Sequence, residues 1–388
     1  MWRHIVSNFL TVLIVILIGI AGLIAWAKGQ YEGPGPLAEA VCVQVERGAS
    51  MSGVSERLRD QGAVSSAYIL RAGADYEGKS GQLKFGSYLI EPGASMQGIV
   101  AQITEGGPSS CGTELNFRIG VNAQQMVLRE LDPATKEFVE VAKFDPKTEE
   151  APAGFAEAAG KADVRLRVTL AEGVTSWQVV EALKSADFLS GEIATVPAEG
   201  SLAPDSYEVK RGSERAALIA AMEASQAARL AAAWEARAPG LPYETMEEAL
   251  VMASIVEKET GVPTERRQVA SVFVNRLERG MKLQTDPTVI YGVTKGEGVL
   301  GRGLRQSELR RATPYNTYVI DGLPPGPICN PGLEAIKATL DPDSTDYLFF
   351  VADGTGGHAF AETLDEHNRN VEAWRKIEAE AAAQPAGN

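Results

Sequence analysis

The sequence predicts an α+β protein built in several parts and attached to a membrane by one N-terminal helix. Three observations lead to this fold class: an uncharged apolar run near the N-terminus, strand-like and helix-like segments separated by glycine turns, and a long alanine-rich run before the last part. With 388 residues, of which 45% are hydrophobic, the chain is long enough to form packed cores in two or three domains.

The N-terminal apolar run covers residues 9–27 and reads FLTVLIVILIGIAGLIAWA, without a charge. A membrane-spanning helix needs about 20 apolar residues, so this run is long enough. The alternative is a cleaved signal peptide, because residues 25–27 have the small-x-small form, but the run exceeds the roughly 7–15 residues of a signal h-region. We therefore expect an uncleaved anchor, with residues 1–8 in the cytoplasm by default and the rest of the chain outside.

Charge and cysteine content narrow the class of protein. The net charge of −14 and the pI near 4.9 argue against nucleic acid as a partner.

Cys42, Cys111 and Cys329 lack the paired spacing of a zinc site, and His358 and His367 have no third imidazole to complete a metal site. In an oxidising compartment Cys42 and Cys111 would be able to form a disulfide, and the alternative is three buried thiols. The common nucleotide, dinucleotide, serine-hydrolase and zinc-protease motifs do not occur, so we expect no metal and no cofactor.

A weak internal repeat follows a Gly/Pro-rich linker at residues 28–40. Each copy predicts a strand, a glycine turn and a helix capped by Ser or Thr. The copies are VERGASMSGVSERL at 45–58, IEPGASMQGIVAQI at 90–103 and LAEGVTSWQVVEAL at 170–183. Between the second and third copies, residues 108–165 are predicted to form an insertion with a mobile loop, because the segment is rich in Ala, Glu, Pro and Lys.

The alanine-rich run at residues 213–240 predicts a long connecting helix. The main domain is expected at residues 241–372, followed by a C-terminal tail at 373–388. This domain opens with apolar residues at helical spacing over 246–260, and a Gly and a Pro follow directly. We predict a helix there, ending just before a polar, turn-rich stretch.

Two glutamates, Glu257 and Glu259, lie in the last turn of that helix. Glu259 follows a bulkier set of apolar residues one turn back and is predicted to be the more desolvated of the two. Desolvation and the negative end of the helix dipole both favour a protonated carboxyl group, which a general acid requires. The alternative is an ordinary surface glutamate, solvated or paired with Arg266 or Arg267.

Four blocks of sequence then form a familiar pattern. Along the chain these are IVEKET, then VASVFVNRL with GMKLQTDPTVIYG, then TPYNTYVIDGLPPGPICNPG, and finally YLFFVADGTGGHAF with EHN. With these blocks in this order, the chain resembles the endolytic murein transglycosylases, the MltG or YceG-like family, over about residues 41–370. The resemblance implies LysM-like βααβ modules at 41–107 and 166–212 and a mixed α/β catalytic domain at 241–372.

By this resemblance the protein would cleave nascent peptidoglycan strands internally, between N-acetylmuramic acid and N-acetylglucosamine, and leave 1,6-anhydromuramoyl ends. It would be a lyase that terminates strand elongation, and Glu259 would act first as acid and then as base. Peptidoglycan, and possibly its synthases, would be partners, with the catalytic domain on the outer side of the bacterial cytoplasmic membrane. Two alternatives stay open: a peptidoglycan-binding scaffold without cleavage activity, and a muramidase that adds water.

Four further residues are candidates for substrate binding. Gln284 and Asp286 would bind sugar hydroxyls or orient Glu259, and the alternative is a turn stabilised by the aspartate. Asn316 would offer an amide to N-acetyl groups and Tyr318 an aromatic ring to a sugar face, and the alternative is a strand with a buried tyrosine. The run from Gly322 to Pro327 is expected to shape a wall of the cleft without chemistry.

Overall fold

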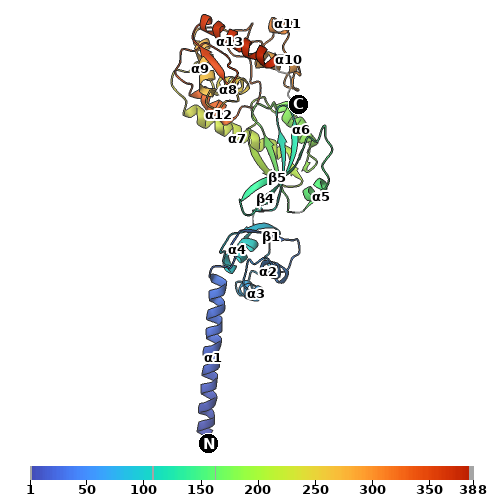
Figure 1. Cartoon of the computed structure of the whole chain (residues 1–388), viewed down its shortest axis with the longest axis vertical. Helices are drawn as coiled ribbons and strands as arrows, with labels where there is room; N and C mark the ends of the chain where they lie inside the picture. Colours follow the sequence, from blue (N-terminus) through green and yellow to red (C-terminus); the bar gives the residue numbers. More distant parts are fainter. Residues whose placement is uncertain (1, 107–108, 162, 384–388) are drawn as a thin grey trace. The chain divides into compact units, whose positions relative to one another are not determined.

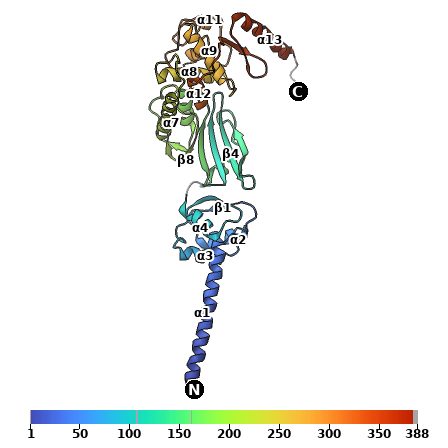
Figure 2. The ribbon, with the colours of Figure 1, turned by 90° about the vertical axis from the view of Figure 1, so that its left-hand side faces the viewer.

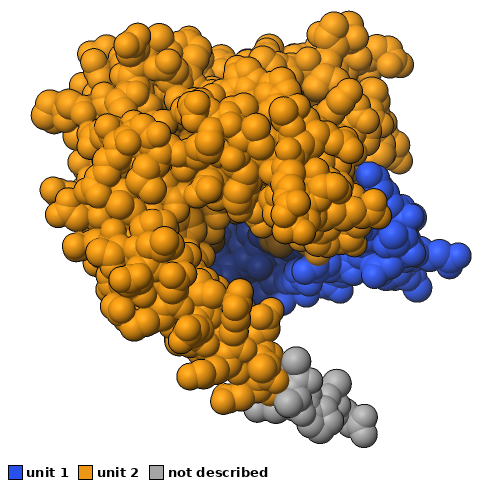
Figure 3. Space-filling view, turned by 90° about the horizontal axis from the view of Figure 1, so that it is seen from above, with its two compact units in different colours: residues 1–116, 126–166 blue, residues 117–125, 167–388 orange. Residues whose placement is uncertain are grey.

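The computed structural model describes residues 2–106, 109–161 and 163–383 of the chain, in which helices and strands alternate (Figure 1). It confirms a mixed α/β protein with one apolar N-terminal helix. The chain divides into two compact units, residues 1–116 with 126–166 and residues 117–125 with 167–388 (Figure 3). Met1 of the predicted cytoplasmic segment and residues 384–388 of the predicted tail lie outside the described residues.

The N-terminal helix α1 runs from Trp2 to Glu32. Its Phe9–Glu32 portion is long and apolar enough to cross a membrane, and no part of its most apolar window is buried inside the protein. Apolar side chains that the protein leaves uncovered are most stable in lipid. The helix is therefore consistent with a single-pass anchor, and it extends beyond the predicted span of residues 9–27.

The predicted flexible linker at residues 28–40 is wrong in its first part, because α1 continues as far as Glu32. Tyr31 is only 7% exposed and belongs to the core of the first unit. Its ring lies directly against Gly73, where a β-carbon would collide with it. Packing of this ring outweighs the glycine and proline content that suggested a linker, so the helix passes directly into the folded part.

After α1, the first unit continues with a strand, two helices and a second strand, and a further helix follows. β1 and β2 pair antiparallel, with Val41 opposite Ile90, and Ser50 and Ser95 cap their helices as predicted. This is the βααβ order expected of a LysM-like module, although the assignment to LysM stays a prediction. The elements are β1 (Val41–Val45), α2 (Met51–Asp60), α3 (Ala67–Tyr76), β2 (Gly86–Ile90) and α4 (Met96–Glu105).

The segment 108–165 was predicted as an insertion with a mobile loop, and this is wrong, because it contains three strands and a short helix. The three strands join two later ones in a five-stranded sheet of order β5-β4-β3-β6-β8. The Ala-, Glu-, Pro- and Lys-rich composition on which the prediction rested belongs to residues 148–163, whereas β3, β4 and β5 precede it. The elements are β3 (Thr113–Ile119), β4 (Gln124–Asp132), β5 (Glu137–Phe144), α5 (Phe155–Gly160), β6 (Arg165–Leu170) and β8 (Ser206–Val209).

The predicted second βααβ module at 166–212 is also corrected. Its described residues contain one helix, α6 (Ser176–Ser185), which Thr175 caps as expected. The first strand of this region, β6, belongs to the five-stranded sheet. The short strand β7 (Leu189–Ser190) pairs in parallel with β9 (Ser213–Glu214). The shared glycine turn and capped helix are local features that do not fix which strands pair.

The rest of the second unit is mainly helical (Figure 2). Helices α8, α9 and α12 pack together around a core that includes Met252, Phe273 and Ile336. The predicted tail is helical as far as Ala383. The elements are α7 (Arg215–Glu235), α8 (Met246–Glu259), α9 (Arg266–Glu278), α10 (Asp286–Thr294), α11 (Gln306–Leu309), α12 (Leu333–Leu340), β10 (Phe349–Ala352), β11 (His358–Ala361) and α13 (Leu364–Ala383).

A disulfide joins Cys42 in β1 to Cys111 just before β3, with their Cα atoms 5.9 Å apart. Cys329 is a buried free thiol. The structure therefore favours the disulfide over three free thiols. The bond lies within the first unit and ties strand β1 to the point where the chain leaves α4.

Replacing both Cys42 and Cys111 by serine should destabilise the first unit by about 2–4 kcal/mol, because the unfolded chain loses a covalent constraint across a long loop. Amide hydrogen exchange in β1 and β2 measures this change locally. Reductant should bring the wild type to the level of the variant and leave the variant unchanged. Equal exchange in both oxidised proteins would contradict a stabilising role of the bond.

Candidate active site

Helix α8 ends in the two glutamates predicted to be of interest. It begins at Thr245, whose hydroxyl accepts from the Glu248 N–H at 3.2 Å while the Glu248 side chain returns to the Thr245 N–H. This capping box and a buried apolar face fix where the helix starts and how it is rotated. The predicted helix at 246–260 is confirmed, and it delivers Glu259 at its last turn.

The Glu259 carboxyl group accepts a hydrogen bond from the Thr285 hydroxyl. Burial raises the pKa of Glu259, and the negative charge of Asp286 raises it further. The hydrogen bond from Thr285 and the positive charges of His358 and Arg276 act in the opposite direction without cancelling the effect of burial. A carboxyl group in these surroundings holds its proton to higher pH than usual, as general acid catalysis requires.

A strained turn places Thr285 against Glu259. Gln284 has a φ of 50°, in the left-handed region that residues other than glycine rarely adopt. The turn is held by the Gln284 N–H, which donates to the Thr317 carbonyl at 3.1 Å, and by the Thr285 N–H, which donates to the Thr317 hydroxyl at 3.0 Å. Gln284 itself is exposed beside the carboxyl group, where its side chain is free to meet a ligand.

Asn316 and Tyr318 lie on the loop that follows α11, whereas Asp286 is the first residue of α10. The Tyr318 hydroxyl donates to the Asp286 carboxylate at 2.7 Å, and the charge of Asp286 adds to the effect of burial on the pKa of Glu259. Asn316 is fully buried, and its amide donates to three backbone carbonyls within residues 308–311 at 2.8–3.1 Å. Direct contact between Asn316 and a sugar stays a prediction, and its burial favours a role in shaping this loop.

Sequence reasoning missed Arg276. This residue is only 7% exposed, and its guanidinium donates to the carbonyls of Leu348 at 2.7 Å and Leu283 at 2.6 Å. Its positive charge counters the rise in the pKa of Glu259. The signal in the sequence was an arginine within the otherwise apolar helix VASVFVNRL, because buried arginines usually have a specific electrostatic partner.

His358 is held in place by Glu265. The carboxylate accepts from the His358 backbone N–H at 2.9 Å and lies 2.8 Å from Nδ1 of the ring. This pair fixes the ring at the start of β11, from where its charge acts on Glu259.

Glu257 differs from Glu259 in its neighbours and is less deeply buried. Its carboxylate accepts from the Gly332 N–H at 2.9 Å, where α12 begins. Burial raises the pKa of Glu257 to about 7, with a further contribution from the charge of Glu172. Burial raises the pKa of both carboxyl groups, and Glu259 is the more deeply buried of the two, as predicted. Glu257 stabilises a helix start, whereas Glu259 faces the polar side chains expected of an active site.

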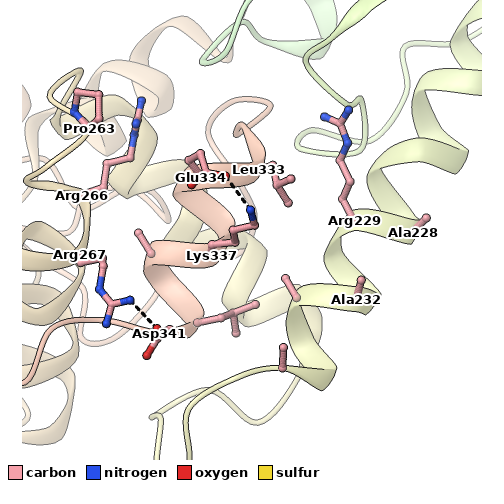
Figure 4. Close-up of a pocket in the computed structure, with 14 residues that line it drawn as sticks. Ala228, Arg229, Ala232, Pro263, Arg266, Arg267, Leu333, Glu334, Lys337 and Asp341 are labelled. Carbon is pink, nitrogen blue, oxygen red and sulfur yellow. Dashed lines mark hydrogen bonds and ion pairs between the residues drawn. The ribbon is translucent and has the colours of Figure 1, made fainter.

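A cavity of about 780 Å³ lies between α7, α9 and α12 (Figure 4). Of the described residues that line it, none is a predicted site residue. The cations that line it have acidic partners: Arg267 binds Asp341, and Lys337 binds Glu334 at 2.8 Å. Arg229 and Arg266 pair with Asp205 and Glu172, which lie outside the lining. Glu259 and its polar neighbours, rather than this groove, are therefore the candidate active site.

A shielded carboxyl group beside hydrogen-bonding side chains, on a mixed α/β framework, is suited to acid–base chemistry. The YceG-like family model matches residues 43–140 and 143–373. This protein belongs to the YceG-like family, which confirms the resemblance drawn from its four sequence blocks.

Three relatives share the name endolytic murein transglycosylase. The endolytic murein transglycosylase of Bacillus subtilis is 28% identical over 336 residues, which cover 86% of this chain and 84% of that protein. The endolytic murein transglycosylases of two Streptococcus pneumoniae strains are 28% identical over 354 residues and cover 85% of this chain. The match spans 58% of the length of the streptococcal proteins. A crystal structure of a protein described as yceG-like from Listeria monocytogenes aligns with 85% of this chain and 99% of that one, at 26% identity and a TM-score of 0.45.

Glu257→Gln should change how stability depends on pH. The folded state keeps the Glu257 proton up to a pKa of about 7, whereas the unfolded chain releases it near 4.5. The wild type therefore loses stability as pH rises between these values. Glutamine keeps an acceptor for the Gly332 N–H but does not titrate, so the variant should gain up to about 3 kcal/mol relative to wild type by pH 8.

Denaturant unfolding at pH 5 and pH 8 tests this expectation. Glu334→Gln, which removes the same charge from an exposed position on α12, controls for the change in net charge. The same pH dependence in wild type and Glu257→Gln would show that the Glu257 carboxyl group is not shifted as described.

Proposed function

We propose that this protein is an endolytic lytic transglycosylase that cuts peptidoglycan strands between N-acetylmuramic acid and N-acetylglucosamine. The observation that carries the proposal is the Glu259 carboxyl group, whose pKa burial raises, at the end of α8 beside Thr285 and Asp286. Membership of the YceG-like family and relatives named endolytic murein transglycosylase support it. The enzyme is then a lyase.

One carboxyl group is sufficient for this reaction. Protonated Glu259 donates its proton to the glycosidic oxygen as the bond from C1 of N-acetylmuramic acid to that oxygen breaks. The resulting carboxylate then takes the proton of the sugar's own C6 hydroxyl, whose oxygen bonds to C1. The product is a 1,6-anhydromuramoyl end, Glu259 recovers its proton, and no water is added.

The neighbouring residues have separate roles in this proposal. Asp286 keeps Glu259 protonated through its negative charge, and Tyr318 holds the Asp286 carboxylate. Arg276 stabilises the Glu259 carboxylate once the proton has left. Gln284, exposed on its strained turn, binds a sugar hydroxyl or N-acetyl group. Asn316 acts indirectly, because its side-chain oxygen accepts the Tyr318 N–H at 3.0 Å.

We place the catalytic part on the outer side of the cytoplasmic membrane, anchored through α1. The uncovered apolar surface of Phe9–Glu32 and the disulfide between Cys42 and Cys111 support this location, because disulfides persist in oxidising compartments. In that position the enzyme meets new glycan strands close to the synthases that extend them. It would then terminate strand elongation.

A water-adding muramidase is the second candidate, and Asp286 is the observation that favours it. Ordinary glycosidases use a pair of carboxyl groups around the scissile bond, and Asp286 lies close enough to Glu259 to affect its pKa. Here, however, Asp286 accepts the Tyr318 hydroxyl, which leaves it less free to activate water or attack C1. Product masses separate the two reactions, because the anhydro product has one water fewer.

Glu259→Gln should abolish internal cleavage, with a loss in kcat of about 10²–10⁴ or more, since the variant can neither donate nor accept the proton. Uncrosslinked glycan strands are incubated with wild type or variant, and products are identified by mass spectrometry. Glu257→Gln, two residues away with the same chemical change, is the matched control and should still produce anhydro ends. Cleavage by Glu259→Gln at the wild-type rate would refute Glu259 as the acid, and reducing ends from the wild type would show a muramidase.

Two neighbouring substitutions should move the pH profile in opposite directions. Activity requires protonated Glu259, so kcat/KM falls as pH rises through its pKa. Asp286→Asn removes a charge that raises this pKa and should shift the alkaline limb to lower pH. Thr285→Val removes a hydrogen bond that lowers it and should shift the limb to higher pH. Shifts of the same sign would contradict this account of the site.

A further inference from the structure

A second cavity, of about 340 Å³, lies within the second unit, and chain neighbours of Glu259 and Asp286 line it. Lys258, the residue before Glu259 on α8, lines it. So does one face of α10, the helix that begins at Asp286. The cavity therefore shares both of the helices that carry the acid and its neighbour. Its α10 wall consists of Pro287, Ile290, Tyr291 and Thr294.

Hydrogen bonds between distant segments hold the cavity open. The Thr175 hydroxyl at the start of α6 donates to the Gly296 carbonyl at 2.6 Å. On another wall the Tyr291 hydroxyl donates to Glu199 at 3.2 Å, which fixes the orientation of the ring. Gly296 has a φ of 78°, and a β-carbon there would crowd the Tyr291 ring. The cavity is thus formed before a ligand arrives, as is usual for binding sites.

The charge of the cavity is positive in a chain whose net charge is −14. Among the described residues that line it, the charged ones are Lys258 and Arg302. Arg302 is neutralised by Glu308, which binds both terminal nitrogens of the guanidinium at 2.9 and 2.7 Å. Lys258 makes one long hydrogen bond, 3.4 Å to the Gly173 carbonyl. An ammonium group has three donors, so Lys258 has capacity left for an anion.

The remaining lining surface is mainly apolar. Val121 from the β3–β4 turn, Ile290 from α10 and Val299 from the loop after α10 are among the side chains that provide it. A ligand with small apolar side chains and free carboxylates matches this combination of surface and charge. A strand without stems keeps only the lactyl carboxylate on each muramic acid and lacks the apolar side chains that would cover these walls.

We propose that this cavity is a second subsite, which binds the acidic peptide stem carried by the muramic acid residue at the scissile bond. Lys258 pairs with a carboxylate of the stem, and the apolar walls cover its small side chains. The inference rests on the proposed function, because it takes a glycan strand as the substrate at Glu259. The stem branches from the sugar whose glycosidic oxygen Glu259 protonates. Lys258 and Pro287, the chain neighbours of Glu259 and Asp286, line the cavity, so a stem of several residues reaches it from that sugar.

The test compares two forms of one substrate: uncrosslinked strands with their stems, and the same strands after an amidase has removed the stems. The full-length wild type should have a higher kcat/KM on the strands with stems. Lys258→Met keeps the aliphatic part of the side chain and should lower the ratio of the two kcat/KM values about tenfold, the usual contribution of a hydrogen bond to a charged group. Lys184→Met, at an exposed position on α6, is the matched control and should leave the ratio unchanged.

A second variant tests the same proposal independently, in case Lys258→Met fails to fold. Val299→Glu adds a negative charge at an exposed edge of the cavity and should lower the same ratio by repulsion. If both variants keep the wild-type ratio, or lower kcat/KM equally on both substrates, the cavity does not bind the stem. In either case wild-type production of anhydro ends would leave the proposed function standing, whereas its absence would remove the function itself.

Discussion

The buried Asn330 joins separate segments of the second unit through its hydrogen bonds, and the position of helix α8 depends on them. Its amide nitrogen donates to the Val174 carbonyl and its oxygen accepts the Leu202 N–H, both at 2.9 Å, and its backbone bonds Gly173 and Val174. An amide with its hydrogen-bonding capacity used in this way tolerates almost no displacement. Two residues earlier, the Ile328 N–H donates to Ser254 on the inner face of α8 at 3.0 Å. This short segment therefore fixes α8, the helix that ends in Glu259, relative to Val174 and Leu202.

The same segment explains why two glutamates separated by one residue have different functions. Glu257 turns toward Gly332, at the end of the segment that holds Asn330, and caps the helix that follows. Glu259 lies on another side of α8 and meets the turn at Thr285. Both carboxyl groups lose solvent, and burial raises both pKa values. Glu259 has exposed polar residues close to it in the chain's fold, because Gln284 and Asp286 flank Thr285.

Several features were predicted from sequence because their causes are local. The apolar N-terminal helix, the capped helices at Ser50, Ser95 and Thr175, and helix α8 follow from residues close together in the chain. The pairing of strands does not. The segment 108–165 was misread because the composition of residues 148–163 does not describe the strands before them, and the third repeat copy resembles the first locally while its strand β6 joins a different sheet. Burial of Tyr31 against Gly73 is likewise a tertiary contact that composition does not reveal.

The sequence by itself determined the membrane-anchor candidate, the α+β class, the family and the helix that ends in Glu259. The spacing of apolar residues and four ordered sequence blocks are sufficient for these. Only the tertiary structure decided what surrounds that carboxyl group: Thr285 and Arg276 close to it, Asn316 turned inward, and the cavity beside Lys258. The physical reason is that the pKa of a carboxyl group depends on desolvation and on charges brought near it from distant parts of the chain.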